Sequence, residues 1–187
     1  MLEEAQKFFV DAAKDESRSI YKKDAFVRSS QVSDVSYKLA YALNRGGNTF
    51  EGNVTISFYL TAEGAQSDEI YVDYRGEKVH SLGVNGTEVT SGNPFHDHRV
   101  YFAKEHLKEG SNTAIIRFTT RYVRDCEGAN YFKDNDDGEE YIYTDCEPAN
   151  QHKIFPCFDQ PDIKASYTLL AVVPKGWHVF ANSPQNG

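Results

Sequence analysis

Carboxylate side chains gather in one part of this 187-residue sequence, between positions 124 and 147. Arg124 and Lys133 are the only basic residues in that stretch. The acidic residues are Asp125, Glu127, Asp134, Asp136, Asp137, Glu139, Glu140, Asp145 and Glu147. Carboxylates with little countercharge attract cations, including ammonium groups. This composition would suit a site for an ammonium ligand, and it would equally suit a solvated acidic loop that binds nothing.

The centre of the acidic stretch, Lys133–Gly138, invites comparison with a calcium-binding loop. An EF-hand loop needs an acid at its first position, a central glycine and a glutamate at its last position. With Gly138 as the central glycine, the first and last positions hold Lys133 and Thr144, so the pattern fails. We therefore interpret the stretch as a solvated acidic loop.

Histidine and cysteine do not complete a catalytic or metal-binding set. His96 and His98 could present two ligands from one face of a strand, whereas zinc takes three or four. The sequence has no HExxH motif, no GxSxG motif and no phosphate-binding glycine loop. Cys126, Cys146 and Cys157 carry no feature of a nucleophile and are expected to be buried or idle thiols. We predict no catalytic residue and no metal ligand in this chain.

The overall composition excludes some classes of partner. The net charge is −8 and no cluster of Lys and Arg appears, which argues against nucleic-acid binding. No apolar run is long enough to span a membrane, so no membrane partner is expected. Three cysteines at scattered positions argue against a disulfide framework, and Glu3 and Glu4 do not fit a secretory signal. We therefore expect a reducing compartment and a cytoplasmic protein.

Two periodicities predict the elements that position these residues. Residues 2–14 repeat apolar side chains at helical spacing, and Glu3 and Glu4 stand where the helix dipole favours acids, which predicts a leading helix. After residue 30 the period changes to two, which indicates strands with one apolar and one polar face. The predicted strands cover residues 35–41, 54–60, 70–74, 113–123 and 167–173.

These patterns predict a mainly β fold, either a β-sandwich or a large curved sheet, antiparallel to mixed, with an N-terminal helix. We divide the chain into a leading helix and lead-in at residues 1–25 and one β-domain at residues 26–187. Asn85-Gly86 predicts a tight hairpin. Pro174-Lys175-Gly176 separates the last long strand from residues 177–180, and a short helical turn is expected at 148–153.

A more specific signal lies in residues 139–163, which read EEYIYTDCEPANQHKIFPCFDQPDI. This segment closely resembles the signature Y-x-Y-T-Q-x-E-x-x-x-A-R-R-x-F-P-C-F-D-E/Q-P-x-x-K of zinc aminopeptidases of the aminopeptidase N family. Residues 164–169 resemble the strand that follows in that family, and residues 176–184 resemble its closing hairpin. The specific resemblance covers about residues 130–184, and the upstream strands match in pattern only.

The resemblance implies a saddle-shaped N-terminal β-domain that precedes a thermolysin-like catalytic domain. That catalytic domain carries G-x-M-E-N and HExxH motifs, and neither motif occurs here. We expect the catalytic domain and its zinc to lie outside this chain, which would need no cofactor itself. Alone it should hydrolyse nothing, because it lacks the metal, the activated water and the general base. The implied partners are the downstream catalytic domain and the N-terminus of a peptide substrate.

The resemblance also gives a role to Glu147. In the family, the side chain at this position reaches the active site and helps to bind the α-amino group of the substrate. A carboxylate facing an ammonium group makes a short charge-assisted hydrogen bond. An alternative is that Glu147 caps the turn at 148–153, where a helix dipole favours an acid. Both roles are compatible, because a carboxylate has two oxygens.

Two departures from the family signature lie near Glu147. Asp145 stands where glutamine is usual and is a possible neighbour in substrate binding. Its added charge would attract an ammonium group or raise a carboxyl pKa by repulsion. His152 and Lys153 stand where two arginines are usual, so bidentate pairing in that region is in doubt.

Two other functions remain open at the level of sequence. The first is a non-catalytic interaction or scaffold module that keeps the fold without the enzyme. The second is a free-standing carbohydrate or peptide binder, for which Trp177 and the many tyrosines would supply contacts.

Overall fold

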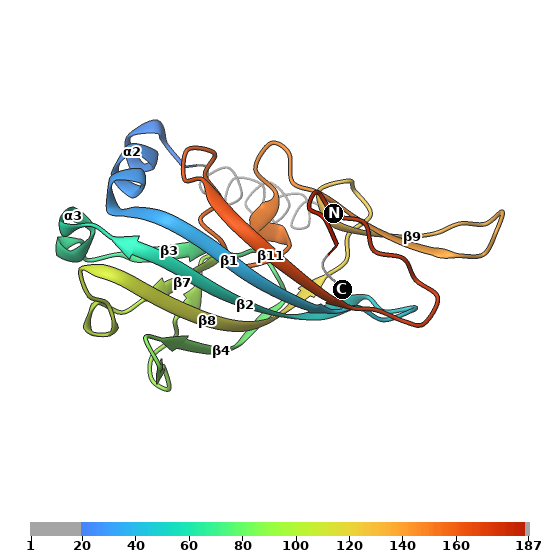
Figure 1. The fold of residues 1–187 in the computed structure, drawn as a ribbon, viewed down its shortest axis with the longest axis horizontal. Coiled ribbons are helices and arrows are strands. Elements are labelled where there is room, and N and C mark those ends of the chain that lie inside the picture. The colour runs from blue at the N-terminus through green and yellow to red at the C-terminus, as the bar shows by residue number, and fades with distance from the viewer. Residues whose placement is uncertain (1–19, 186–187) are drawn as a thin grey trace, which may run out of the picture.

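The computed structural model describes residues 20–185, which form a strongly twisted, mainly β structure (Figure 1). The helix predicted at residues 2–14 lies outside the described residues. The first described element is the helix α2 (Lys22–Gln31). The predicted boundary between residues 25 and 26 falls inside α2 and stays a prediction.

The larger sheet confirms the predicted mixed topology. Among the described residues, six strands pair in the order β11-β1-β2-β8-β4-β5. β11 runs parallel to β1, and the other neighbours are antiparallel. The bounds are β1 (Val32–Ala42), β2 (Thr49–Leu60), β4 (Lys78–Val84), β5 (Thr87–Glu88), β8 (Gly110–Arg121) and β11 (Ala165–Val172).

A smaller sheet forms the second layer. Its strands are β3 (Ile70–Asp73), β6 (Phe95–His96) and β7 (Arg99–Phe102), paired in the order β3-β7-β6. Alternate side chains of β2 turn toward the core, where the ring of Phe58 stacks on Phe102 of β7 with centroids 5.8 Å apart. The short helices are α3 (Ala62–Gln66), η1 (Lys104–His106) and η2 (Gln151–Lys153). The two sheets therefore enclose one apolar core.

The acidic stretch is not the loop that we predicted. It forms a two-stranded hairpin of β9 (Gly128–Lys133) and β10 (Glu140–Asp145), which projects from the body of the molecule (Figure 1). Aromatic residues with high strand propensity alternate through it, and Phe132 packs on Tyr141 across the strands with centroids 6.5 Å apart. The prediction of a loop was therefore wrong for the strands and holds only for the turn between them.

The two predicted turns had different outcomes. The hairpin at Asn85-Gly86 is confirmed, with φ of 51° and 83° at these residues, as a type I′ turn requires. The closing hairpin expected from residues 176–184 is wrong, because no described strand follows β11. Residues 177–180 find no strand partner among the described residues, and the side chain of Phe180 is 93% exposed.

The packing of Gly52 generates a first prediction. Gly52 of β2 lies opposite Phe118 of β8, and a Cβ at Gly52 would come within 2.3 Å of the Phe118 ring. Because Phe118 is fully buried, its ring has no room to move away. We expect Gly52→Ala to destabilise the chain by about 1–3 kcal/mol, the usual cost of overpacking, in urea unfolding.

Gly83→Ala in β4 is the matched control. A Cβ at Gly83 would meet its nearest neighbour, the carbonyl oxygen of Thr87, at an ordinary 3.7 Å. This variant should unfold at or slightly above the urea concentration of the parent chain, because alanine restricts the unfolded state. Equal stability of the two variants would contradict the packing argument.

Candidate functional site

The segment after β10 makes hydrogen bonds with both sheets. Asp73 of β3 and Cys157 exchange backbone hydrogen bonds of 2.8 and 3.0 Å. The hydroxyl of Thr120 in β8 donates to the carbonyl oxygen of Ile154 at 2.9 Å. Residues 154–158 are buried, so this part of the segment belongs to the core.

Aromatic contacts hold the same segment in place. The ring of Phe155 meets Tyr37 of β1 edge to face at 5.5 Å, and Phe158 meets Phe58 of β2 in the same manner at 5.6 Å. The backbone N–H of Phe158 donates to the Tyr37 hydroxyl at 3.0 Å. Burial raises the pKa of Tyr37, so the hydroxyl stays protonated. The F-P-C-F run, residues 155–158, therefore packs in the core.

A buried ion pair connects this segment to α2. The side chain of Arg28 is 4% exposed, and its Nη1 donates to Asp73 Oδ2 at 2.6 Å. Its Nε donates to the side-chain oxygen of Gln160 at 3.1 Å, and Gln160 in turn donates to the carbonyl of Ala25. Sequence reasoning missed this cluster, because Arg28 and Asp73 occupy positions that look like polar surface.

His152 and Asp159 form a second polar anchor. Both the ring Nδ1 and the backbone N–H of His152 lie within hydrogen-bond distance of Asp159 Oδ2, at 2.6 and 3.1 Å. Burial would raise the pKa of Asp159, but the hydrogen bonds from His152 outweigh burial and lower it. The neighbouring Lys153 pairs with Glu127 of the loop before β9. Each of the two positions where the signature usually has arginine thus pairs with one acidic residue, Asp159 for His152 and Glu127 for Lys153.

The three cysteines are free, and the expected burial holds for Cys157 alone, because Cys126 and Cys146 are exposed. Cys157 is buried, and burial raises the pKa of its thiol well above the usual value. Burial first, and then the carboxylates of Asp159 and Asp145, raise the pKa of Cys146. A raised pKa keeps a thiol protonated and unreactive, which gives the buried Cys157 the character of a structural residue, whereas Cys146 is an exposed residue.

Asp145 and Glu147 stand at the end of β10 and in the turn that follows. Asp145 Oδ1 accepts the backbone N–H of Glu147 at 3.1 Å, so the structure brings these two residues together. Asn150 closes the turn, because its side chain donates to the Glu147 carbonyl and its N–H donates to the Cys146 carbonyl, at 2.8 and 2.9 Å. The Glu147–Pro148 peptide bond is cis.

The Glu147 side chain is exposed, and its carboxylate has no hydrogen bond or ion pair with another described residue. It therefore does not cap η2, the alternative that the sequence left open. Asp145 fixes the backbone of this turn, whereas the Glu147 carboxylate stays available to a ligand. Its most direct chemical capacity is to accept hydrogen bonds from a cationic donor.

Residues 20–185 contain no group of three or more His, Cys, Asp or Glu side chains arranged to hold a metal ion. His96 stacks on Tyr101 at 4.4 Å and approaches Asp97 at 3.3 Å, which does not amount to a zinc site. Zinc therefore does not fit the described part of this chain. No helix in that part is long and apolar enough to cross a membrane.

The fold and this turn define a β-domain in which the exposed carboxylate of Glu147 lies on a turn that its neighbours fix. The family model described as the peptidase M1 N-terminal domain matches residues 33–187. That match covers most of the sequence, and the chain belongs to this family. The resemblance found in the signature segment is thereby confirmed.

Two aminopeptidases that are similar in sequence agree with this family assignment. Over 168 residues the chain is 28% identical to an aminopeptidase N of Streptomyces lividans, a match that covers 89% of this chain and 19% of that protein. It is 25% identical to the glutamyl aminopeptidase of Sus scrofa, covering 82% of this chain and 17% of that protein. This chain therefore spans less than a fifth of the length of these relatives.

A solved structure supports the fold. The leukotriene A4 hydrolase of Saccharomyces cerevisiae superposes with a TM-score of 0.64 and 19% identity. The superposition covers 87% of this chain and 27% of that one. At this level of identity the similarity concerns the fold alone.

The contact between His152 and Asp159 generates a pH prediction. Because the pKa of Asp159 is lowered in the folded chain, its carboxylate stabilises the fold above its unfolded pKa, about 3.8. That contribution is lost as the pH falls through the folded value. Asp159→Asn should therefore cost about 1.5 kcal/mol or more at pH 7, and the difference from the parent should shrink below pH 4.

Urea unfolding at a series of pH values between about 2 and 7 measures this difference, a range set by the pKa of an aspartate. Asp68→Asn is the control, because that side chain is 99% exposed. A constant difference between parent and Asp159→Asn across the range, or the same pH-dependent loss in both variants, would contradict the assignment.

Proposed function

We propose that this chain is the N-terminal substrate-anchoring and structural domain of a zinc aminopeptidase, which removes N-terminal amino acids from peptides. A downstream catalytic domain of the same protein would supply the zinc and the reacting groups. The peptide N-terminus is the proposed ligand of Glu147. The single observation that carries this proposal is the exposed and available Glu147 carboxylate on a turn fixed by its neighbours.

The chemistry favours this role. An ammonium group bound by a carboxylate forms a charge-assisted hydrogen bond that strengthens when the site is closed to water. The same contact would explain a preference for chain ends, since an internal peptide bond offers no ammonium group. Asp145 adds negative charge two residues away and holds the turn through the N–H of Glu147. We propose Asp145 as a positioning residue, because its carboxylate acts on the backbone of Glu147.

A scaffold or interaction module is the second candidate. The specific observation in its favour is the exposed aromatic surface of the β9–β10 hairpin, where Phe132, Tyr141 and Tyr143 are each about half exposed. Contiguous exposed aromatic side chains often mark contact surfaces. This surface suits docking of a catalytic domain as well as docking of another protein, so activity must decide between the two functions.

We also propose that the protein is cytoplasmic and has neither a nucleic-acid nor a membrane partner. The three free cysteines support a reducing compartment. The net charge of −8 disfavours a phosphate backbone as partner.

Substitution of Glu147 in the full-length protein tests the proposal. With a free-amine aminoacyl substrate, Glu147→Ala should lower kcat/KM by roughly 30-fold or more, the effect of losing one desolvated charge partner. Glu147→Gln should lose less, because its amide oxygen still accepts a hydrogen bond. The 187-residue chain alone is the blank and should show no activity.

Glu109→Ala is the matched control, since Glu109 is an exposed glutamate in the loop before β8. It should retain the parent kcat/KM. An active protein in which Glu147→Ala behaves like this control would leave the domain a structural role only. A full-length protein with neither zinc nor activity would support the scaffold function.

A further inference from the structure

The β9–β10 hairpin has one face that packs on the molecule and one face that is largely exposed. Its register pairs Tyr131 with Ile142, and both side chains pack against the apolar core. The neighbouring pair, Phe132 and Tyr141, lies on the opposite face, because successive side chains of a strand alternate. Tyr143 shares that face, since it stands two residues after Tyr141. Phe132, Tyr141 and Tyr143 are each about half exposed and form what we call the outer hairpin face.

The outer hairpin face borders the turn that carries Glu147. Asp145 is two residues beyond Tyr143 on β10 and therefore lies on the same face. Its Oδ1 accepts the backbone N–H of Glu147 at 3.1 Å, so the turn starts where the face ends. At the usual rise of a strand, Tyr141 and Asp145 are about 13 Å apart. A protein domain that covers the Glu147 turn is therefore wide enough to cover these aromatic side chains as well.

The size of the outer hairpin face suits the centre of an interface between domains. A buried Phe or Tyr side chain covers roughly 150–250 Å², so three half-exposed rings offer on the order of 300 Å². Interfaces between domains of one chain bury about 600–1,500 Å². The centre of such a contact is apolar and rich in aromatic residues, and its rim is polar.

The rim of the outer hairpin face carries mostly negative charge. Acidic residues lie at the tip and at the base of the hairpin, namely Asp125, Glu127, Asp134, Asp136, Asp137, Glu139 and Asp145. A second copy of this chain would bring the same acids against them, and the net charge of −8 adds to the repulsion. The rim therefore disfavours self-association and favours a partner surface that has Lys or Arg around an apolar patch.

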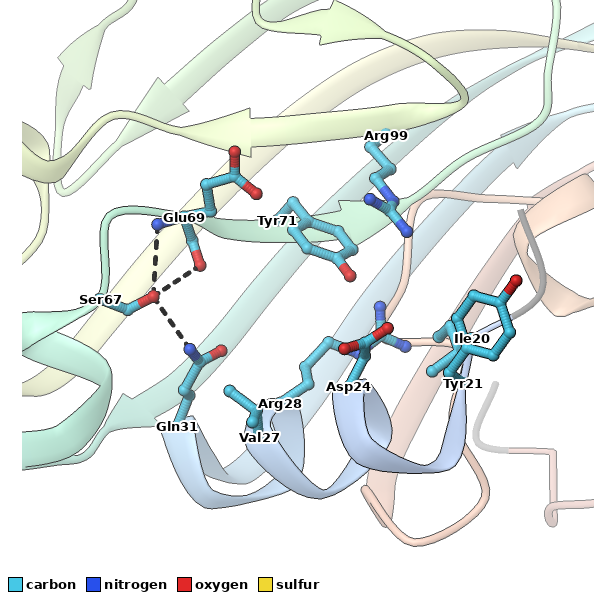
Figure 2. Close-up of a pocket in the computed structure, with 10 residues that line it drawn as sticks. All are labelled: Ile20, Tyr21, Asp24, Val27, Arg28, Gln31, Ser67, Glu69, Tyr71 and Arg99. Carbon is cyan, nitrogen blue, oxygen red and sulfur yellow. Dashed lines mark hydrogen bonds between the residues drawn. The ribbon is translucent and has the colours of Figure 1, made fainter. Parts of the chain in front are cut away.

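Two further observations bear on what covers this face. The cavity between α2 and the small sheet, shown in Figure 2, is lined by other residues, so a small molecule bound there would leave the outer hairpin face exposed. This chain spans less than a fifth of the length of the two aminopeptidases named above, so a protein of that length has ample further surface to place against the hairpin.

We propose that the outer hairpin face is the docking surface for the downstream catalytic domain, which faces it with an apolar patch bordered by Lys or Arg. This inference rests on the proposed function, because Glu147 can bind a substrate only if the domain that holds the substrate lies against its turn. The aromatic side chains then supply the apolar contact, and the acidic rim fixes the orientation of the two domains.

Hydroxyl-radical footprinting of the purified full-length protein tests the proposal, with mass spectrometry to measure the oxidation rate of each side chain. Each rate is divided by the rate of the same residue in the urea-unfolded protein, which removes differences in intrinsic reactivity. Tyr59 is the internal control, because it is 42% exposed and alternates with buried residues of β2. Phe132, Tyr141 and Tyr143 should be oxidised more slowly than Tyr59 by roughly fivefold or more, as expected in a covered apolar centre.

Tyr143→Asp in the full-length protein places a charge in the proposed apolar centre and should release the contact. The oxidation rates of Phe132 and Tyr141 should then approach that of Tyr59, because burial of an unpaired carboxylate is unfavourable. Tyr59→Asp is the matched control and should leave Phe132 and Tyr141 as protected as in the parent protein. Phe118 is fully buried and should stay unreactive in both variants, which shows that each variant is folded.

Three results would overturn the proposal. The first is oxidation of the outer hairpin face as fast as that of Tyr59, whatever the activity of Glu147→Ala. The second is protection that increases with protein concentration, because a second copy would then cover the face. The third is protection that Tyr143→Asp leaves intact. Protection together with full activity of Glu147→Ala would support the docking surface and remove the substrate role of Glu147, so the two proposals fail independently.

Discussion

The buried ion pair between Arg28 and Asp73 is the contact on which the arrangement of the signature segment depends. Arg28 joins α2 to β3 and to Gln160, while Asp73 bonds Cys157 through its backbone and the N–H of Asp159 through its side chain. Removing one member would leave the other charged and buried, which costs roughly 3–5 kcal/mol. The pair therefore ties together a helix, a strand and a segment far apart in the sequence.

This anchoring has a functional consequence. The segment from Ile154 to Gln160 cannot shift without breaking core contacts, and it is joined directly to the turn of Asp145 and Glu147 through Asn150 and η2. The backbone of Glu147 is therefore fixed before a ligand binds, and only its side chain would lose conformational freedom on binding. In the function that we propose, the polar network would act through the position of the Glu147 backbone.

The sequence predicted the parts of the fold that follow from local patterns. The alternation of apolar and polar residues predicted β1, β2 and β8. The Asn85-Gly86 turn was predicted because a type I′ turn requires two residues that accept positive φ. The β9–β10 hairpin was missed because a high density of charge hid its alternating aromatic residues. The cluster around Arg28 could not be predicted, since burial of an arginine depends on partners 45 and 132 residues away. For the candidate site, Glu147 came from the resemblance, whereas its availability required the structure.

These contacts also explain why the signature segment has so specific a sequence. Phe155, Cys157 and Phe158 fill the core, and Asp159 and Gln160 satisfy buried polar groups. Each of these positions is constrained by packing or hydrogen bonding, whatever the protein catalyses. The F-P-C-F-D-Q run, residues 155–160, is thus typical of the fold. A scaffold would need this fold as much as an enzyme would. Glu147 is different, because its side chain contributes nothing visible to the fold, and the functional assignment therefore depends on that residue.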